Sequence, residues 1–195
     1  MIYLFHGPDR YSLWKAYTEL RQAIGPPEVW EANITHLEPP GLTRASLLAA
    51  CQVVPFLAQR RLVVIEGLLS LYEREPLEEP PPLPAAWRGI ADDLRSLPET
   101  TDLLFLDGRL TPRNPLFQEV APVARVREFT PPRGQELRRW VREQALRLGA
   151  RLSPPALDLL VDLVGPDLGA VDGELQKLAL YKGTATVERE DVLAL

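Results

Sequence analysis

The sequence is short of the residues that build disulfides and metal sites. It has one cysteine, Cys51, and two histidines, His6 and His36, among 195 residues. A single cysteine cannot form an internal disulfide, which is typical of a reducing compartment. Since the histidines lie far apart and no carboxylate cluster has the spacing of metal ligands, no metal site is predicted.

Long apolar runs are also missing. No run approaches the roughly 18 residues of a membrane span, and no basic segment precedes a short apolar run, as in a signal peptide. The net charge is −5, which argues against a dedicated nucleic-acid binder without excluding a local basic patch. We therefore expect a soluble, cytoplasmic protein without membrane association.

Apolar runs of strand composition alternate with helical patterns in the first two thirds of the chain. The predicted strands are residues 2–5, 29–34, 62–65, 103–106 and 123–129. Apolar residues recur at helical spacing in the intervening residues 13–24, 43–51, 87–97 and 115–120. This alternation predicts an α/β fold, a parallel sheet with helices on both faces.

Two stretches interrupt this pattern. Residues 71–84 are rich in proline and glutamate, which predicts a surface loop because proline disrupts helices and strands. Beyond a proline-rich hinge at residues 130–134 only helical spacing recurs, with Ser153 and Pro154 predicted to start one helix. We therefore predict an α/β domain at residues 1–132 and a small helical domain, without strands, at residues 133–195.

The first strand is followed by an incomplete phosphate-binding loop. A working loop has the pattern G-x-x-x-x-G-K-[ST], whose backbone amides and lysine hold phosphates. From Gly7 onward the first glycine is present, but Ser12 replaces the second, Leu13 the lysine and Trp14 the magnesium-binding hydroxyl. Pro8 removes one amide donor. The sequence predicts the architecture of a nucleotide site without its chemistry.

The strand at residues 62–65 supports the same interpretation. It ends in Glu66, so one carboxylate stands where a nucleotide site of this kind needs an acidic pair. Glu66 and Asp107 follow two predicted strands, at the edge where α/β proteins bind ligands. We interpret both as strand-end residues that interact with solvent or backbone amides, rather than as catalytic groups.

The connection before that strand has unusual chemistry. It contains Pro55, Phe56 and Leu57, which we call the apolar tip. Connections between helices and strands normally run over the surface and favour Gly, Asn, Asp and Ser. The pair Phe56-Leu57 therefore either folds back into the core or is held out for another protein.

Several motifs, in this order and spacing, resemble the delta subunit of bacterial DNA polymerase III, the clamp-opening subunit of the clamp loader. The matching stretches are residues 3–7, 54–64, 104–110, 137–141, 165–168 and 173–181, which include Tyr3-Leu4-Phe5-His6-Gly7 and Val54-Pro55-Phe56-Leu57-Ala58-Gln59. No single motif is specific, but together they extend over essentially the whole chain.

The resemblance implies an AAA+-like domain with an inactive nucleotide site, followed by a helical lid. Active relatives carry a lid arginine after a Gly-x-Asp-Leu turn; here Gly169 follows that turn. It also implies that the apolar tip, Pro55, Phe56 and Leu57, enters a hydrophobic pocket of the ring-shaped sliding clamp (the beta subunit). The protein would promote ring opening for loading onto primed DNA.

The same resemblance implies no cofactor and no ATP hydrolysis by this chain, within a nucleotidyltransferase holoenzyme. The expected partners are the sliding clamp and the tau/gamma and delta-prime subunits, with primed DNA reached through the complex. The family continues into a C-terminal collar that is absent from this chain. We expect clamp contact to survive that loss and tight pentamer assembly not to.

Two alternatives remain at this point: a divergent P-loop NTPase, and an AAA+-like adaptor unrelated to the clamp. A run of arginines in the helical part also has two interpretations, a patch that faces DNA or another subunit and a solvated helix face with pairs such as Arg139 and Glu143. We favour the second. The arginines of the run are Arg133, Arg138, Arg139, Arg142, Arg147 and Arg151.

Overall fold

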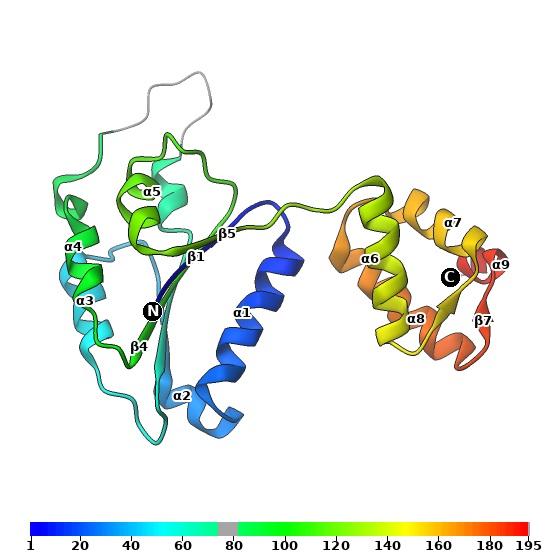
Figure 1. The fold of residues 1–195 in the computed structure, drawn as a ribbon, viewed down its shortest axis with the longest axis horizontal. Helices are drawn as coiled ribbons and strands as arrows, with labels where there is room; N and C mark the ends of the chain where they lie inside the picture. The colour runs from blue at the N-terminus through cyan, green and yellow to red at the C-terminus, as the bar shows by residue number, and fades with distance from the viewer. Residues whose placement is uncertain (74–81, 195) are drawn as a thin grey trace. The chain divides into compact units, whose positions relative to one another are not determined.

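The computed structural model describes residues 1–73 and 82–194 and divides the chain into two compact units (Figure 1). We call Met1–Phe129 the α/β unit and Thr130–Leu195 the helical unit, and each is described by itself. In the described part of the chain, no helix combines the length and apolar character needed to cross a membrane.

A five-stranded parallel sheet forms the centre of the α/β unit, in the order β2-β3-β4-β1-β5. The inner strands β3 and β4 are almost wholly buried, as continuous apolar runs predict. The strands are β1 (Ile2–His6), β2 (Ile34–Leu37), β3 (Arg61–Glu66), β4 (Thr101–Asp107) and β5 (Arg125–Glu128).

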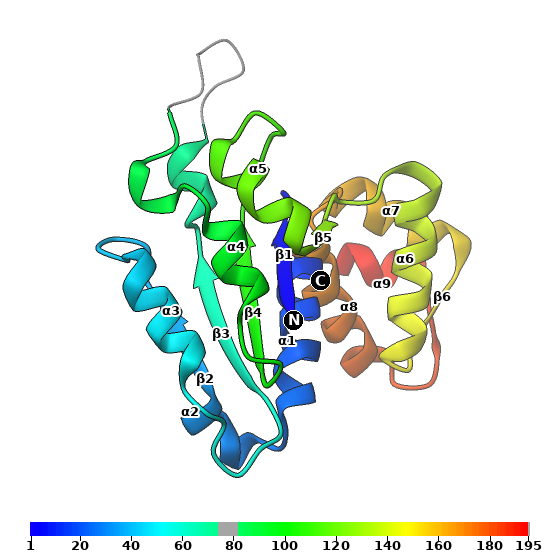
Figure 2. The ribbon, with the colours of Figure 1, turned by 60° about the vertical axis from the view of Figure 1, so that its left-hand side comes forward.

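Helices cover both faces of this sheet, which confirms the predicted fold class (Figure 2). Alternate residues of β3 face opposite sides: Val63 and Ile65 join the core under α3, α4 and α5, while Leu62 and Val64 join the core under α1. These helices are α1 (Arg10–Ile24), α3 (Arg44–Gln52), α4 (Ile90–Arg95) and α5 (Pro115–Val120).

The helices α3 and α5 begin at polar capping residues. Thr43 and Ser46 form a reciprocal capping box at the start of α3, and Asn114 accepts two backbone N–H bonds at the start of α5, directly before Pro115. These contacts satisfy amides that a helix cannot pair internally. They place the starts of α3 and α5 at Arg44 and Pro115, close to the predicted starts at residues 43 and 115.

The strand predicted at residues 29–34 is wrong. The structure has a short 3-10 turn, η1 (Pro27–Val29), then one turn of helix, α2 (Trp30–Asn33), and only then β2. Proline at the start of η1 favours the turn, and the Trp30 indole N–H donates to the Gly25 carbonyl at 2.9 Å. Because β2 is a short edge strand, its sequence pattern is weak.

Most of the loop predicted at residues 71–84 lies outside the described residues. Its first two residues end the 3-10 helix η2 (Leu69–Tyr72). Two more 3-10 turns, η3 (Ala85–Trp87) and η4 (Ala121–Val123), precede α4 and β5. The helical pattern predicted at residues 87–97 is therefore divided between η3 and α4.

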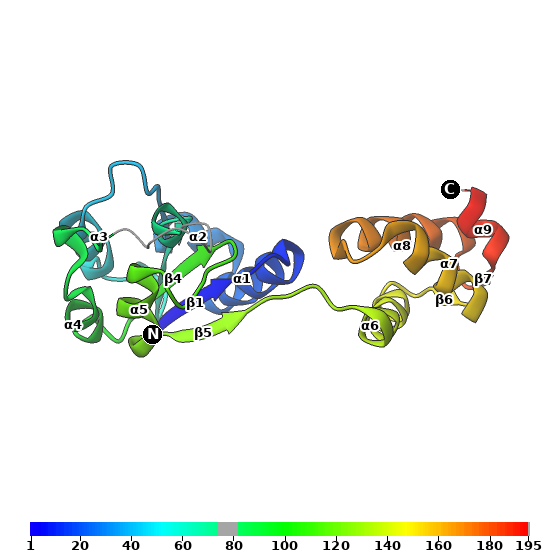
Figure 3. The same cartoon turned by 90° about the horizontal axis from the view of Figure 1, so that it is seen from above.

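The helical unit packs four helices around its own apolar core (Figure 3). They are α6 (Gly134–Arg147), α7 (Pro154–Val164), α8 (Leu168–Lys182) and α9 (Arg189–Ala194). The expectation of no strand here is wrong, because β6 (Arg151–Leu152) and β7 (Thr186–Val187) pair in parallel. Strands of two residues are too short to leave an alternating pattern in the sequence.

One capping prediction also needs correction. Ser153 stands at the N-cap of α7, but its side chain forms no capping hydrogen bond, and its buried hydroxyl has no hydrogen-bond partner in the described structure. Its backbone N–H instead donates to the Val187 carbonyl at 3.0 Å, which extends the β6–β7 pairing. Pro154 does occupy the first turn, as predicted.

Candidate functional site

The apolar tip between α3 and β3 is exposed. The side chain of Phe56 is 63% exposed and that of Leu57 is 81% exposed. Val53 and Val54, which precede them, are exposed as well. The alternative in which Phe56-Leu57 folds back into the core is therefore wrong. Four of the five residues from Val53 to Leu57 are large, apolar and exposed, and a concentration of exposed apolar residues is typical of a binding site.

The backbone at the apolar tip is constrained. Leu57 has φ = 53° and is, among the described residues, the one non-glycine with positive φ. A non-glycine residue in the left-handed region costs about 1–2 kcal/mol. Such a conformation persists where the surroundings over-determine it, and it is commonest at functional sites.

The Asn33 side chain binds the backbone of the apolar tip. This wholly buried side chain accepts a hydrogen bond from the Phe56 backbone N–H at 2.7 Å and donates to the Phe56 carbonyl at 2.7 Å. It also donates to the Val29 carbonyl at 2.8 Å. Sequence reasoning missed Asn33, because its partner is 23 residues away and lies in an irregular loop.

A second set of contacts fixes the same loop where β3 begins. The Arg60 guanidinium binds both carboxylate oxygens of Asp102, at 2.7 and 2.6 Å, and the Arg61 N–H donates to the Thr100 carbonyl at 2.9 Å. The terminal amine of Met1 lies 3.0 Å from the same carboxylate. A bidentate guanidinium–carboxylate pair fixes geometry as well as charge, so the loop is anchored at Phe56 and again where it meets β3.

The loop after β1 is closed by its own hydrogen bonds. Asp9, buried at the N-cap of α1, accepts from the Ser12 backbone N–H at 3.0 Å. Its own N–H donates to the Phe129 carbonyl at 3.1 Å, and the Leu13 N–H donates to the Asp9 carbonyl. In a phosphate loop these amides would face the ligand. Here a carboxylate of the chain occupies the helix N-terminus, and its charge would repel phosphate.

Leu13 and Trp14 stand where a phosphate loop has its lysine and its magnesium-binding hydroxyl, and both pack against other residues of the α/β unit. Leu13 is buried in the core under the sheet, at 4% exposure. Trp14 packs edge-to-face against Tyr17, with ring centroids 5.1 Å apart. The Gly7 N–H donates to the Gly108 carbonyl at 2.9 Å and so joins the ends of β1 and β4.

Glu66 and Asp107 occupy the carboxyl ends of β3 and β4, as predicted, but have different environments. Glu66 is exposed and forms an ion pair with Arg10, 2.8 Å between Nη2 and Oε1. Asp107 is buried and accepts from the backbone N–H groups of Leu69 and Ser70 and from the Ser70 hydroxyl. Asp107 thus holds η2 against the sheet.

Burial raises the pKa of Asp107 from its usual 3.8 to about 6, against the opposing effect of the Ser70 hydrogen bonds. Because the folded pKa exceeds the unfolded one, the folded state binds more protons between these values and gains stability as the pH falls. The difference corresponds to roughly 3 kcal/mol as an upper bound.

We therefore expect the wild type to gain unfolding free energy relative to Asp107→Asn as the pH falls from 7 to 4. The substitution itself serves as the reference, because it removes this titration and leaves all others in place. Urea unfolding of both proteins across this range measures the difference. Parallel pH profiles would show that Asp107 does not titrate as described.

Other candidate residues do not converge on a site. His6, at the end of β1, is buried, and burial lowers its pKa. No group of three or more His, Cys, Asp or Glu is placed to hold a metal ion in the described part of the chain. In the helical unit, Gly169 lies exposed in the first turn of α8, after its N-cap Asp167.

The arginine run lies in α6 and in the residues on either side of it. Arg138 is half-buried and donates to Asp158 of α7 at 2.7 Å, while the remaining members of the run are exposed. This ion pair joins two helices, whereas the pairs expected from the sequence lie within one helix. Trp140 in α6 is partly exposed.

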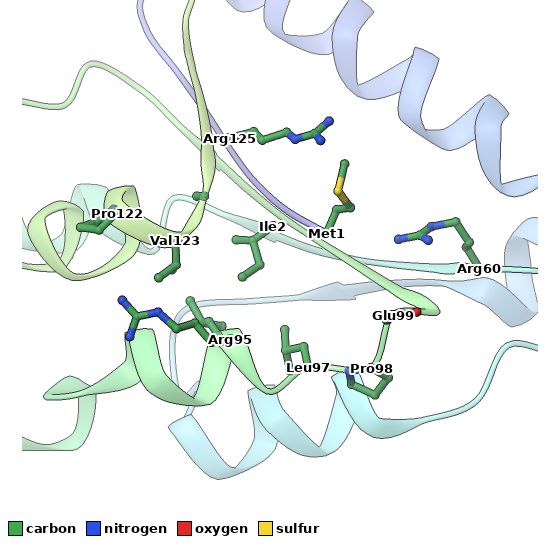
Figure 4. Close-up of a pocket in the computed structure, with 12 residues that line it drawn as sticks. Met1, Ile2, Arg60, Arg95, Leu97, Pro98, Glu99, Pro122, Val123 and Arg125 are labelled. Atoms are coloured by element: carbon green, nitrogen blue, oxygen red, sulfur yellow. The ribbon is translucent and has the colours of Figure 1, made fainter.

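A hollow of about 680 Å³ lies at the amino ends of the strands (Figure 4). Its lining includes Arg60, Arg95 and Arg125, together with Met1 and Glu99. Two of these arginines already have partners, Asp102 for Arg60 and Asp92 for Arg95. Parallel α/β sheets bind ligands at the opposite, carboxyl edge, so we assign this hollow no function.

Comparison with a family model gives a match to DNA polymerase III, delta subunit, over residues 3–79. This stretch holds the apolar tip, Asn33 and the closed loop after β1. Residues 3–79, less than half of the chain, are thus similar to the delta-subunit family. The resemblance in the sequence is thereby confirmed, and the match includes the stretch around Phe56 that carries much of it.

Solved structures match the fold over the whole chain or nearly all of it. The DNA clamp loader delta protein of Bacillus subtilis matches 100% of this chain with a TM-score of 0.71 at 21% identity. A DNA polymerase III gamma subunit-related protein of Thermotoga maritima also matches 100% of it (TM-score 0.52, 15% identity). The RuvB branch migration motor of the same organism matches 98% (TM-score 0.57, 12% identity).

At these identities the structural matches establish the fold, which is AAA+-like. The chain spans 57%, 64% and 60% of the length of the delta, gamma-related and RuvB chains. No curated protein matches the chain.

Proposed function

We propose that this chain is a delta-type clamp-loader subunit of DNA replication that binds the sliding clamp through Pro55, Phe56 and Leu57. The observation that carries the proposal is the exposure of Phe56 and Leu57 on a loop anchored at Phe56 and at Arg60. The delta-family match over residues 3–79 includes that loop. An exposed aromatic and aliphatic pair on a constrained backbone has the properties of a binding hot spot.

The apolar tip acts by differential binding. Burying Phe56 and Leu57 in a hydrophobic pocket of the clamp contributes roughly 3–6 kcal/mol before the costs of association. If the pocket is better formed in the open or distorted ring than in the closed ring, the same contact shifts the ring toward opening. The chain needs no chemical step for this.

The closed loop after β1 supports the proposal that nucleotide chemistry belongs to other subunits. Asp9 and the backbone carbonyls of the chain take the amides that would bind phosphate, and Leu13 is part of the core. ATP acts in the tau/gamma subunits, which are partners together with delta-prime, and primed DNA is reached through the complex.

The clamp contact is tested by mixing the purified chain with the purified sliding clamp of the same organism and analysing the mixture by gel filtration. We expect the two to elute together at micromolar concentration. Separate elution at all concentrations tested would instead favour an AAA+-like adaptor unrelated to the clamp.

The rival function, a divergent NTPase, makes a different prediction. Asp9 occupies the helix N-terminus, and Leu13 stands where a phosphate loop has its lysine. We therefore expect no saturable ATP binding up to millimolar concentration in the presence of magnesium. Isothermal titration and a phosphate-release assay measure this. Micromolar affinity or turnover would establish the rival and refute the closed-loop interpretation.

A further inference from the structure

The conformation of the apolar tip depends on one side chain outside the loop. Asn33 receives the Phe56 backbone N–H on Oδ1 and donates from Nδ2 to the Phe56 carbonyl, both at 2.7 Å. The backbone N–H and the backbone carbonyl of Phe56 are therefore both paired with the Asn33 side chain. A side chain can replace backbone pairing in this way where the chain forms no regular structure.

The orientation of the Asn33 amide is fixed by its three partners. Nδ2 faces two carbonyl oxygens, those of Val29 and Phe56, and Oδ1 faces an N–H. Turning the amide over would place its oxygen against both carbonyls. At 0% exposure, water cannot replace these bonds, so their loss leaves buried polar groups unpaired.

Asn33 is itself tied to the sheet. It ends α2, and the next residue, Ile34, begins β2 and pairs with Leu62 of β3. Asn33 thus links the apolar tip to β2, which follows α2 in the chain and pairs with β3. Together with the anchor between Arg60 and Asp102, this explains how Leu57 is kept at positive φ while its side chain stays in solvent.

We propose that Asn33 is a positioning residue that preorganises Phe56 and Leu57 for docking, an inference that rests on the proposed clamp contact. A loop already in its bound conformation loses less entropy on association. Where the competent conformation is populated only in part, the apparent affinity falls by that fraction. Loosening the tip therefore weakens binding without removing any side chain that touches the partner.

The test uses Asn33→Ala and Asn33→Ser. The serine variant retains a hydroxyl that can donate to the carbonyl four residues earlier, that of Val29, but is too short to hold Phe56. It therefore separates the role in the loop from the role in α2. The matched control is Asn114→Ala, because Asn114 is also buried in the α/β unit and bonds Leu69 and Glu73, away from the loop.

Two measurements are made on each variant. Hydrogen exchange of the Phe56 amide needs no partner, and we expect it to accelerate about tenfold or more in both Asn33 variants and to be unchanged in the control. Affinity for the purified clamp should fall about tenfold in the Asn33 variants, through slower association, and remain at the wild-type value in Asn114→Ala.

The outcomes separate the two proposals. A folded Asn33→Ser protein with wild-type exchange at Phe56, or with wild-type clamp affinity, would overturn the positioning role. If the wild type fails to bind the clamp, the proposed function fails, and the exchange measurement still decides whether Asn33 orders the apolar tip.

Discussion

The double variant Phe56→Ala, Leu57→Ala is expected to lose at least about 100-fold in affinity for the sliding clamp, because truncated hot-spot residues cost about 2–4 kcal/mol or more. Its melting temperature should stay close to that of the wild type, since both side chains lie mostly in solvent. Surface plasmon resonance with immobilised clamp and a thermal melt measure the two quantities.

A matched control is available in the helical unit. Leu163 and Leu180 are 62% and 86% exposed, so the double variant Leu163→Ala, Leu180→Ala removes a similar amount of exposed apolar surface. We expect it to bind the clamp like the wild type. Equal losses in the two double variants would indicate nonspecific adhesion, and unfolding of the first variant would show that its residues are structural.

The second large effect is expected at Gly7. A Cβ atom there would lie 2.1 Å from the Phe129 carbonyl oxygen, and the backbone has φ = +135°. Phe129 cannot move away easily, because its N–H donates to His6 and its carbonyl accepts from Asp9. Gly7→Ala should therefore cost about 3–5 kcal/mol from strain and overpacking together, measured by chemical denaturation of the α/β unit within the full chain.

Two other glycines separate the causes. Gly67 has φ = +80° with open space around it, and Gly108 has neither positive φ nor a neighbour closer than 3.9 Å. We expect Gly67→Ala to show the strain alone and Gly108→Ala to be nearly neutral. If Gly7→Ala were as mild as Gly67→Ala, the tight contact between the loop and Phe129 would not exist in solution.

The sheet was predictable where the strands are apolar and mostly buried. β1, β3 and β4 each contain a short continuous apolar run, and α5 has both a capping asparagine and a proline at its start. β2 was misplaced because the prolines before it form a turn and its residues lie at the edge. β6 and β7 were missed because each has two residues.

The site was predictable in part. The apolar tip has a local signal, a proline followed by bulky apolar residues in a connection, and its exposure agrees with the delta-family resemblance. Asp9 also has a local signal, since aspartate before a helix is a common N-cap. Asn33 has none, because its role depends on a contact between distant segments. Sequence patterns report periodicity and local caps, whereas long-range pairing of one polar group requires the fold.

The central claim is that this chain binds the clamp through an exposed apolar loop without using nucleotide. The most direct test is a clamp-binding titration of the wild-type chain with and without magnesium-ATP. We expect the same dissociation constant, micromolar or tighter, under both conditions. No binding, or an affinity that changes more than about tenfold with ATP, would contradict the account.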